Sequence, residues 1–257
     1  MKVTVCELSD QRDSFARDWE QLVAHVEAQR SDLVLLPEMP FCPWFCITPV
    51  FDEDVWRSAV AAHDAWQARL VELAPALVLG TRPVNRDGRR LNEGFCWSKA
   101  QGYSVAHDKF YLPNEEGFWE ASWYERGDGS FTPALCGNAL VGFEICTEVW
   151  GMENARLYGE EGVNLIVTPR ATPKASLDRW LVAGRATAMI SGAFSLSSNH
   201  VGTEADSVHL GGQGWLITPD GGVLGLTSRE EPFITSEIEL NAADMAKRTY
   251  PRYVLLQ

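Results

Sequence analysis

Short apolar runs alternate with amphipathic patterns along this chain, and the alternation limits the folds that it can adopt. "DLVLLP" (32–37) and "NLIVTP" (164–169) are continuous apolar runs, as expected of strands that are buried on both faces. "KVTVCEL" (2–8) also has the pattern of a strand. The segment after it shows the apolar face of a helix at Phe15, Trp19, Leu22, Val23 and Val26. Alternating strands and helices predict an α/β fold in which helices cover mixed sheets.

The remaining segments follow the same scheme. A second helix is predicted over about 54–73, with 52–54 supplying a cap and negative charge for its first turn. "NRDGRR" (85–90) is a turn signal between two strand-like runs and predicts a hairpin. Ser176 can cap a further helix that ends just before Gly192. The other predicted elements are a strand at 138–146, helices at 151–162 and 176–190, a strand at 193–199, and a meander of 213–219, 223–228 and 233–240.

The composition is that of an ordinary globular protein and argues against several classes of function. The 257 residues contain no linker-like tract rich in Pro, Gly or Ser, so we predict a single domain, 1–257. The net charge of −13 and the pI near 4.8 repel nucleic-acid phosphates and anionic lipid, which leaves small molecules or another subunit as partners. No apolar stretch approaches the roughly 18 residues of a membrane span, and the N-terminus turns polar too soon for a signal peptide. A cytoplasmic location is therefore expected.

The six cysteines are too sparse for a disulfide scaffold, and we expect free thiols. Cys42 and Cys46 have the spacing of half a zinc site, but no second Cys/His pair at metal spacing follows. Neither a metal nor another cofactor is expected. Cys146 and His200 form a conceivable cysteine–histidine pair, yet neither lies in the local signatures of papain-like enzymes.

Three residues of complementary chemistry lie at or near the ends of predicted strands: Glu38, Lys109 and Cys146. Open α/β sheets build their sites at strand ends, so these side chains are expected to converge. A carboxylate can take the thiol proton, the thiolate can attack a carbonyl, and an ammonium can stabilise the oxyanion that develops. The set is sufficient for acyl transfer without a histidine.

The segments around these residues resemble a known family. "LPEM" at Glu38, "HDKFYLPN" at Lys109 and "GFEIC" at Cys146 are similar to the signature blocks of the nitrilase superfamily of carbon-nitrogen hydrolases, in the same order and separated by 71 and 37 residues. "FWEASWYERG" resembles the segment where that family places a second glutamate, here Glu120, although Glu115 and Glu116 compete for the position. Later segments match as well, so the resemblance runs nearly from end to end.

The resemblance implies a four-layer α-β-β-α sandwich that assembles into a homodimer or a larger even oligomer. It also implies that Cys146 attacks the substrate carbon while Glu38 acts as general base and acid. Lys109 and the backbone N–H of Thr147 would hold the oxyanion, and Glu120 would position Lys109 or the substrate. We further expect Lys109 and a helix that starts near Met152 to lower the pKa of the Cys146 thiol.

Several other residues are candidates for contact with the substrate. Phe41 and Trp44, in the loop after Glu38, are the first candidates for an aromatic wall, and Trp150 is the next. Arg170 follows a buried strand and is expected on the same rim, where it would hold a substrate carboxylate or form a structural salt bridge.

The substrate class is poorly encoded. Thr147 and Glu148 follow the cysteine, whereas nitrilases usually place Trp-Glu there, so an amide or N-carbamoyl substrate is favoured over a nitrile. The aromatic loop after Glu38 predicts that this substrate has an apolar or aromatic portion. A nitrilase stays an alternative. A catalytically silent scaffold is a second alternative, which the intact nucleophile, base and oxyanion donor argue against.

Overall fold

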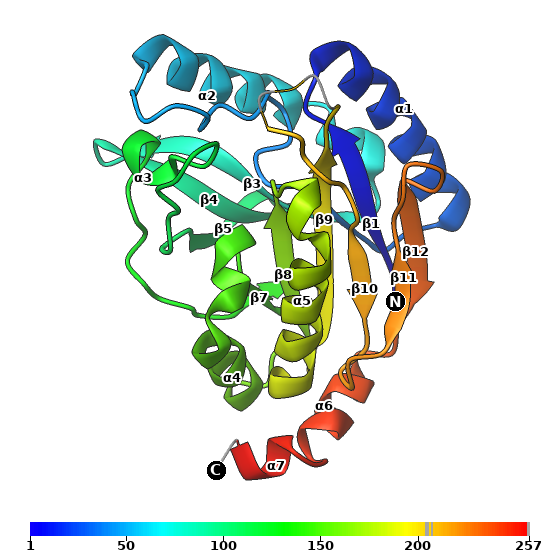
Figure 1. Cartoon of the computed structure of the whole chain (residues 1–257). Coiled ribbons are helices and arrows are strands. Elements are labelled where there is room, and N and C mark those ends of the chain that lie inside the picture. The colour runs from blue at the N-terminus through cyan, green and yellow to red at the C-terminus, as the bar shows by residue number, and fades with distance from the viewer. Residues whose placement is uncertain (204–205, 207, 256–257) are drawn as a thin grey trace.

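The computed structural model describes residues 1–203, 206 and 208–255 and is a mixed α/β structure (Figure 1). The strands are β1 (Lys2–Ser9), β2 (Leu33–Leu35), β3 (Leu77–Arg86), β4 (Arg89–Ser98), β5 (Gly102–Asp108), β6 (Ala134–Cys136), β7 (Ala139–Phe143), β8 (Leu165–Arg170), β9 (Phe194–Val201), β10 (Trp215–Ile217), β11 (Val223–Leu226) and β12 (Phe233–Glu237). The α-helices are α1 (Arg12–Gln29), α2 (Glu53–Gln67), α3 (Glu120–Trp123), α4 (Met152–Glu160), α5 (Leu177–Ser191), α6 (Asn241–Lys247) and α7 (Arg252–Leu255). Short 3₁₀ helices are η1 (Leu70–Leu73), η2 (Cys146–Trp150) and η3 (Lys174–Ser176).

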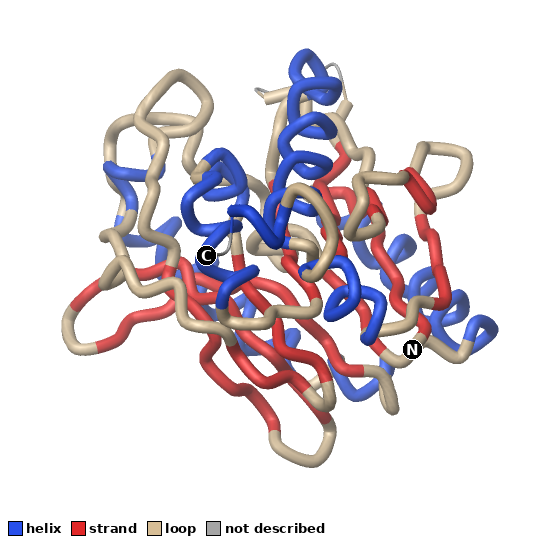
Figure 2. The backbone as a smooth tube through the Cα atoms, turned by 90° about the horizontal axis from the view of Figure 1, so that it is seen from below, coloured by secondary structure: helices blue, strands red, loops and turns tan. Residues whose placement is uncertain are grey.

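Strand β1 joins two sheets. The strand order is β5-β4-β3-β2-β1-β9-β8-β7-β6, with β10 between β9 and β11, and β12 beside β1. The strands from β3 through β2, β1, β9 and β8 to β7 pair in parallel. Helical crossovers connect β1 to β2, β2 to β3, β7 to β8 and β8 to β9, as parallel neighbours require. In Figure 2 the strands occupy the middle of the molecule and helices lie on both outer sides.

The alternation of side chains along the strands creates the layers. Leu33 and Leu35 of one sheet share a buried cluster with Leu165 and Val167 of the other. The residue between each pair faces outward: Val34 packs in the cluster of α1, and Ile166 in that of α4. The architecture is therefore helix, sheet, sheet, helix, and the predicted α/β sandwich is confirmed.

Most of the predicted elements are present. The hairpin turns at Asp87 and Gly88, whose φ angles of 53° and 76° suit the tight turn that Asp-Gly favours. Asp52 caps α2 by accepting hydrogen bonds from the first turn, and α5 ends at Gly192 in the left-handed conformation. Ser176 precedes α5 but does not cap it, because its hydroxyl donates to the carbonyl of Pro173.

One helix boundary and one strand pairing differ from the prediction. The helix predicted over 54–73 ends at Gln67, and the chain turns before η1 so that Leu70 and Leu73 pack fully buried in the cluster of α1. The predicted meander is wrong in its third strand, since β12 pairs with β1 rather than β11. On one side of β1, strand β9 pairs only with Glu7–Ser9. Strand β12 pairs with Lys2–Cys6 on the same side and satisfies backbone groups that would otherwise form an open sheet edge.

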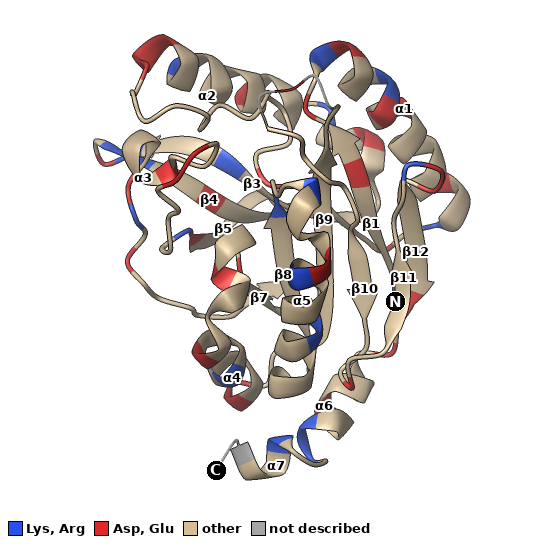
Figure 3. Cartoon of the chain, in the orientation of Figure 1, with Lys and Arg blue, Asp and Glu red and all other residues tan. Residues whose placement is uncertain are grey.

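Charged residues of both signs are interspersed on the outer helices, as Figure 3 shows for α1 and α4. Within the described residues, no helix combines the length and the apolar character that crossing a membrane requires.

Close packing at Gly142, on the strand that leads to Cys146, generates a prediction. A Cβ at this position would lie 2.6 Å from Cδ2 of the buried Tyr158 ring, whose hydroxyl is held by the carbonyl of Phe143. Gly142→Ala should lower the free energy of unfolding by about 1–3 kcal/mol in urea titrations, because a packed ring must shift. At the exposed Gly222, the nearest atom is a Thr218 hydroxyl at 3.0 Å, so Gly222→Ala is the control. Equal losses in the two variants would contradict this account.

Candidate active site

The three residues singled out from the sequence meet in one place. Glu38 follows β2, Lys109 follows β5 and Cys146 follows β7, so each side chain is positioned by the end of a strand. The Lys109 ammonium donates to Glu38 Oε1 at 2.7 Å and to Glu120 Oε2 at 2.6 Å. Glu120 begins the short helix α3 and, like Lys109 and Glu38, is fully buried.

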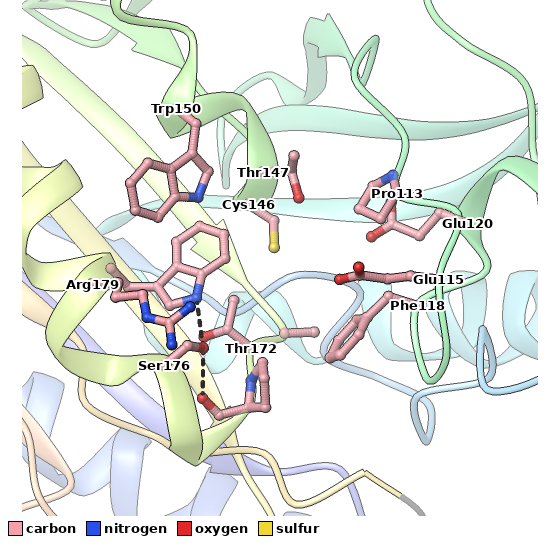
Figure 4. Close-up of a pocket in the computed structure, with 13 residues that line it drawn as sticks. Pro113, Glu115, Phe118, Glu120, Cys146, Thr147, Trp150, Thr172, Ser176 and Arg179 are labelled. Atoms are coloured by element: carbon pink, nitrogen blue, oxygen red, sulfur yellow. Dashed lines mark hydrogen bonds between the residues drawn. The ribbon is translucent and has the colours of Figure 1, made fainter.

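Cys146 occupies a strained turn. Its φ of 52° lies in the left-handed region, where a residue with a side chain is uncommon, at the junction between β7 and η2. Its side chain is 3% exposed and lines a cavity of about 220 Å³ (Figure 4). In that view the sulfur points into the space bordered by Glu115 and Phe118. Strained backbone of this kind clusters at functional sites.

Each carboxylate of the network has one hydrogen-bonded oxygen and one oxygen that has no partner among the described residues. Glu38 Oε1 accepts hydrogen bonds from Lys109 and from the Asn92 amide at 2.7 Å, while its Oε2 is buried and unpaired. Glu120 Oε2 accepts from Lys109 and from the Tyr124 hydroxyl, and its Oε1 is unpaired. The bound oxygens hold the carboxylates in place, and the unpaired oxygens can exchange a proton or bind a ligand.

The electrostatics keep the thiol protonated. Burial and the charge of Glu38 raise the pKa of the Cys146 thiol, Lys109 opposes them, and Glu120 adds to the rise. Lys109 thus lowers this pKa, as predicted, but burial and Glu38 outweigh it, so the net shift is upward rather than the predicted downward one. For Lys109, burial disfavours the charge, but Glu120 and Glu38 outweigh it and hold its pKa well above the usual value. Burial raises the pKa of Glu120 to about 7, against the effect of Lys109.

A further buried carboxylate, Glu148, connects the turn at Cys146 to the loop after Lys109. Its side chain accepts the backbone N–H of Ile145 at 2.8 Å and that of Phe110 at 2.7 Å. It also contacts His107 Nε2 at 2.9 Å. Burial lowers the pKa of His107, but Glu148 outweighs this and raises it. Glu148 lies outside the cavity lining and orients the residues that flank Lys109 and Cys146.

The cavity wall agrees only in part with the prediction. Thr147 and Trp150 line it, as expected from their positions after Cys146. The other described lining residues are Pro113, Glu115, Phe118, Glu120, Ala171, Thr172, Pro173, Ser176, Arg179 and Trp180. The aromatic side chains at the cavity are thus Phe118, Trp150 and Trp180.

Phe41 and Trp44 are not in this wall, so that part of the prediction is wrong. Phe41 packs against the rings of Trp19 and Trp66 in the cluster of α1. The Trp44 indole donates to the carbonyl of Gly117 at 2.9 Å and belongs to another cluster. The loop after Glu38 carries both rings into the protein core, where burial of large aromatic surface stabilises the fold.

Arg170 lies at the carboxyl end of β8, as predicted, but it cannot reach a substrate in the cavity. It is fully buried and donates to the Ser197 hydroxyl at 2.7 Å, to the Thr172 hydroxyl at 2.9 Å and to the carbonyl of Gln213 at 2.6 Å. Its guanidinium also stacks 4.1 Å from the Trp215 ring centroid. Burial lowers its pKa to about 9. The side chain holds the cavity-lining segment at Thr172, and no carboxylate among the described residues forms a salt bridge with it.

The other candidates do not form a site. His200 Nε2 donates to the backbone carbonyl of Glu38 at 2.7 Å and so supports the base rather than pairing with Cys146. Cys46 is fully buried, and burial raises its pKa well above the usual value. Among the described residues, no group of three His, Cys, Asp or Glu side chains is arranged to hold a metal ion.

Comparison with known proteins identifies the family. The family model described as carbon-nitrogen hydrolase matches residues 2–248. The chain belongs to the carbon-nitrogen hydrolase family. It is 24% identical over 245 residues to a chloroplastic omega-amidase of Arabidopsis thaliana, covering 90% of this chain and 65% of that protein. An omega-amidase of Xenopus tropicalis is 24% identical over 226 residues, covering 86% and 81% of the two chains. The crystal structure of a carbon-nitrogen hydrolase from Helicobacter pylori superimposes with a TM-score of 0.86 at 19% identity, covering 99% of this chain and 94% of that one.

Sequence reasoning missed four residues that shape the site of this carbon-nitrogen hydrolase: Asn92, Tyr124, Phe118 and Trp180. Tyr124 lies one helical turn after Glu120 in the same segment, a spacing that brings two side chains together, so this contact had a detectable signal. Asn92 reaches Glu38 from the neighbouring strand β4, which only the strand pairing reveals.

The contact between Tyr124 and Glu120 generates a prediction. Both side chains are buried, and a hydrogen bond from a hydroxyl to a carboxylate contributes more than one between neutral groups. Tyr124→Phe should lower the free energy of unfolding by about 1.5–3 kcal/mol in urea titrations. Tyr158→Phe, which removes a 2.9 Å bond to a neutral carbonyl, should cost only about 0.5–1.5 kcal/mol. A larger loss of unfolding free energy in Tyr158→Phe than in Tyr124→Phe would contradict the assignment of a charged acceptor, Glu120, to the Tyr124 hydroxyl.

Proposed function

We propose that this carbon-nitrogen hydrolase is a cysteine-dependent amidase that releases ammonia from small amides or N-carbamoyl compounds through a thioester on Cys146. The observation that carries the proposal is the bridge of Lys109 between Glu38 and Glu120 beside a buried thiol that lines a cavity. The names of the relatives, omega-amidases, support the amide over other substrates.

In the first step, the unpaired Oε2 of Glu38 takes the proton of the Cys146 thiol, and the sulfur attacks the carbonyl carbon. A base is required because the pKa of this thiol is raised. The carbonyl π electrons move to oxygen and form a tetrahedral oxyanion. Glu38 then gives its proton to the nitrogen, the carbon–nitrogen bond breaks, and ammonia leaves from an acyl thioester.

In the second step, water replaces ammonia at the same position. Glu38 takes a proton from the water while the water oxygen attacks the thioester carbon. The carbon–sulfur bond then breaks and a carboxylic acid is released. The proton returns to the sulfur, which restores the thiol. Glu120 holds Lys109 throughout and presents its unpaired Oε1 toward the acyl group or the water.

Two donors are available for the oxyanion. Lys109 carries three N–H bonds, of which Glu38 and Glu120 accept two, so one is left for the substrate oxygen. The backbone N–H of Thr147, on the residue after the nucleophile, is the second donor. Preorganised donors in a site shielded from water stabilise such charge strongly.

The alternatives have weaker support. A nitrilase lacks support because Thr147 occupies the position where nitrilases usually have tryptophan. A silent scaffold has no need of a buried lysine paired with two carboxylates, which is costly to desolvate. A single domain, a homodimer or larger even oligomer, and a cytoplasmic location stay predictions; the sharing of β1 between the two sheets supports the first.

The nucleophile can be tested directly. Cys146→Ala should lower kcat at least about a thousandfold, because removal of a nucleophile disables the whole catalytic set, while the circular dichroism spectrum is retained. Wild-type protein quenched during turnover of a slow amide should carry the acyl mass on the peptide that contains Cys146. Cys42, a half-buried cysteine, is the matched control and should carry no acyl mass. An adduct on Cys42, or activity retained in Cys146→Ala, would place the reaction elsewhere.

The amide preference is tested by paired substrates. For each acyl group, the primary amide should be hydrolysed with a higher kcat/KM than the matching nitrile, measured by ammonia release. Nitrile turnover equal to or above amide turnover would instead favour the nitrilase.

A further inference from the structure

Two opposite charges face each other across the cavity that holds Cys146. Arg179 lies in the first turn of α5, and Glu115 lies in the loop between Lys109 and α3. In Figure 4 the Glu115 carboxylate points into the cavity from one side, and Arg179 lies on the other. Both residues are exposed, so their charged groups reach the cavity from its open side.

Neither charge is used by the protein itself. Within the described part of the chain, the side chains of Arg179 and Glu115 form no salt bridge and no hydrogen bond, with each other or with another group. Glu120, the remaining charged residue of the lining, is held by Lys109 and Tyr124. The cavity that holds the thiol therefore also presents one cation and one anion without partners among the described residues.

We infer that the substrate carries a carboxylate and an ammonium at the end opposite its scissile bond, as in the ω-amide or ω-ureide of a short α-amino acid. This inference rests on the proposed amidase function. The carboxylate binds Arg179, whose planar guanidinium suits bidentate pairing, and the ammonium binds Glu115. The amide or ureide carbonyl then lies at the Cys146 sulfur.

The size of the cavity and the nature of its walls agree with a short connecting chain. Its volume of about 220 Å³ is below the roughly 300–1,000 Å³ of pockets that take drug-sized ligands. The rings of Phe118, Trp150 and Trp180 offer apolar surface to methylene groups between the two ends of the substrate.

The charge pattern disfavours other amides. A substrate with a carboxylate alone leaves Glu115 facing a like charge, and a cationic amide does the same to Arg179. A neutral aliphatic or aromatic amide leaves both groups unpaired. Selectivity of this kind comes from repulsion and from unsatisfied polar groups as much as from attraction.

Four primary amides that share the same carbon skeleton next to the amide test the inference: glutamine, glutaric acid monoamide, 4-aminobutanamide and butanamide. Asparagine and citrulline extend the test to a shorter and a longer chain. For at least one amino acid the kcat/KM for ammonia release should exceed that of each singly charged amide by about tenfold or more, since each charged contact has that effect. The kcat/KM of this amino acid should exceed that of butanamide by a wider margin.

Variants assign the two contacts. Arg179→Ala should raise KM about tenfold or more for the carboxylate substrates, with a smaller effect on kcat, so that their advantage over butanamide falls. Glu115→Gln should do the same for the ammonium substrates and improve the carboxylate-only amide. Glu116→Gln, at the neighbouring exposed position outside this cavity, and Arg156→Ala, on the exposed face of α4, are matched controls that should leave these ratios unaltered.

The two levels of proposal fail differently. If no amino acid exceeds butanamide and both singly charged amides in kcat/KM by about tenfold or more, the inference is overturned and the amidase is left standing. Absence of ammonia release from every compound, together with no acyl mass on Cys146, overturns the amidase and the inference with it.

Discussion

The burial of the Lys109 ammonium is the constraint on which the site depends. A charge with no exposure to water is tolerated only when it is paired and hydrogen-bonded, and Lys109 obtains this from two carboxylates that come from different parts of the chain. Removal of Lys109 would leave two buried carboxylates without a counter-charge. The ends of β2 and β5 and the start of α3 must therefore stay together, which makes the catalytic geometry a condition of stability.

Buried polar residues outside the cavity extend this constraint to the rest of the site. Glu148 joins the turn at Cys146 to the loop after Lys109 through backbone N–H groups, and Arg170 holds the segment at Thr172 on the other wall. Both side chains are fully buried and neither lines the cavity. They orient backbone rather than substrate, and this support allows a strained nucleophile with a φ of 52° to persist.

Electrostatics separate the chemical end of the cavity from its open end. At the chemical end, burial raises the pKa of the Cys146 thiol. In the proposed mechanism the sulfur therefore becomes nucleophilic as Glu38 accepts its proton, since the thiolate is the reactive form. At the open end, Arg179 and Glu115 are exposed and have no partner among the described residues, which suits groups that meet a solvated substrate.

Most of the strands and the longer helices could be predicted from the sequence, because periodicity reports which face of an element is buried. The convergence of Glu38, Lys109 and Cys146 followed from their places near strand ends, and the addition of Glu120 followed from the family resemblance. Contacts in the folded chain were needed to place β12 beside β1 and to place Phe41 and Trp44 in the core. They were also needed to show that Phe118 and Trp180 line the cavity, and that Arg179, unlike the hydrogen-bonded Arg170, has no partner among the described residues. Local pattern can mark an aromatic or an arginine as a candidate, but the path of the loops decides which of them faces the cavity and which becomes buried. That path depends on contacts between residues distant in the chain, such as the bond of Trp44 to Gly117, which no local window contains.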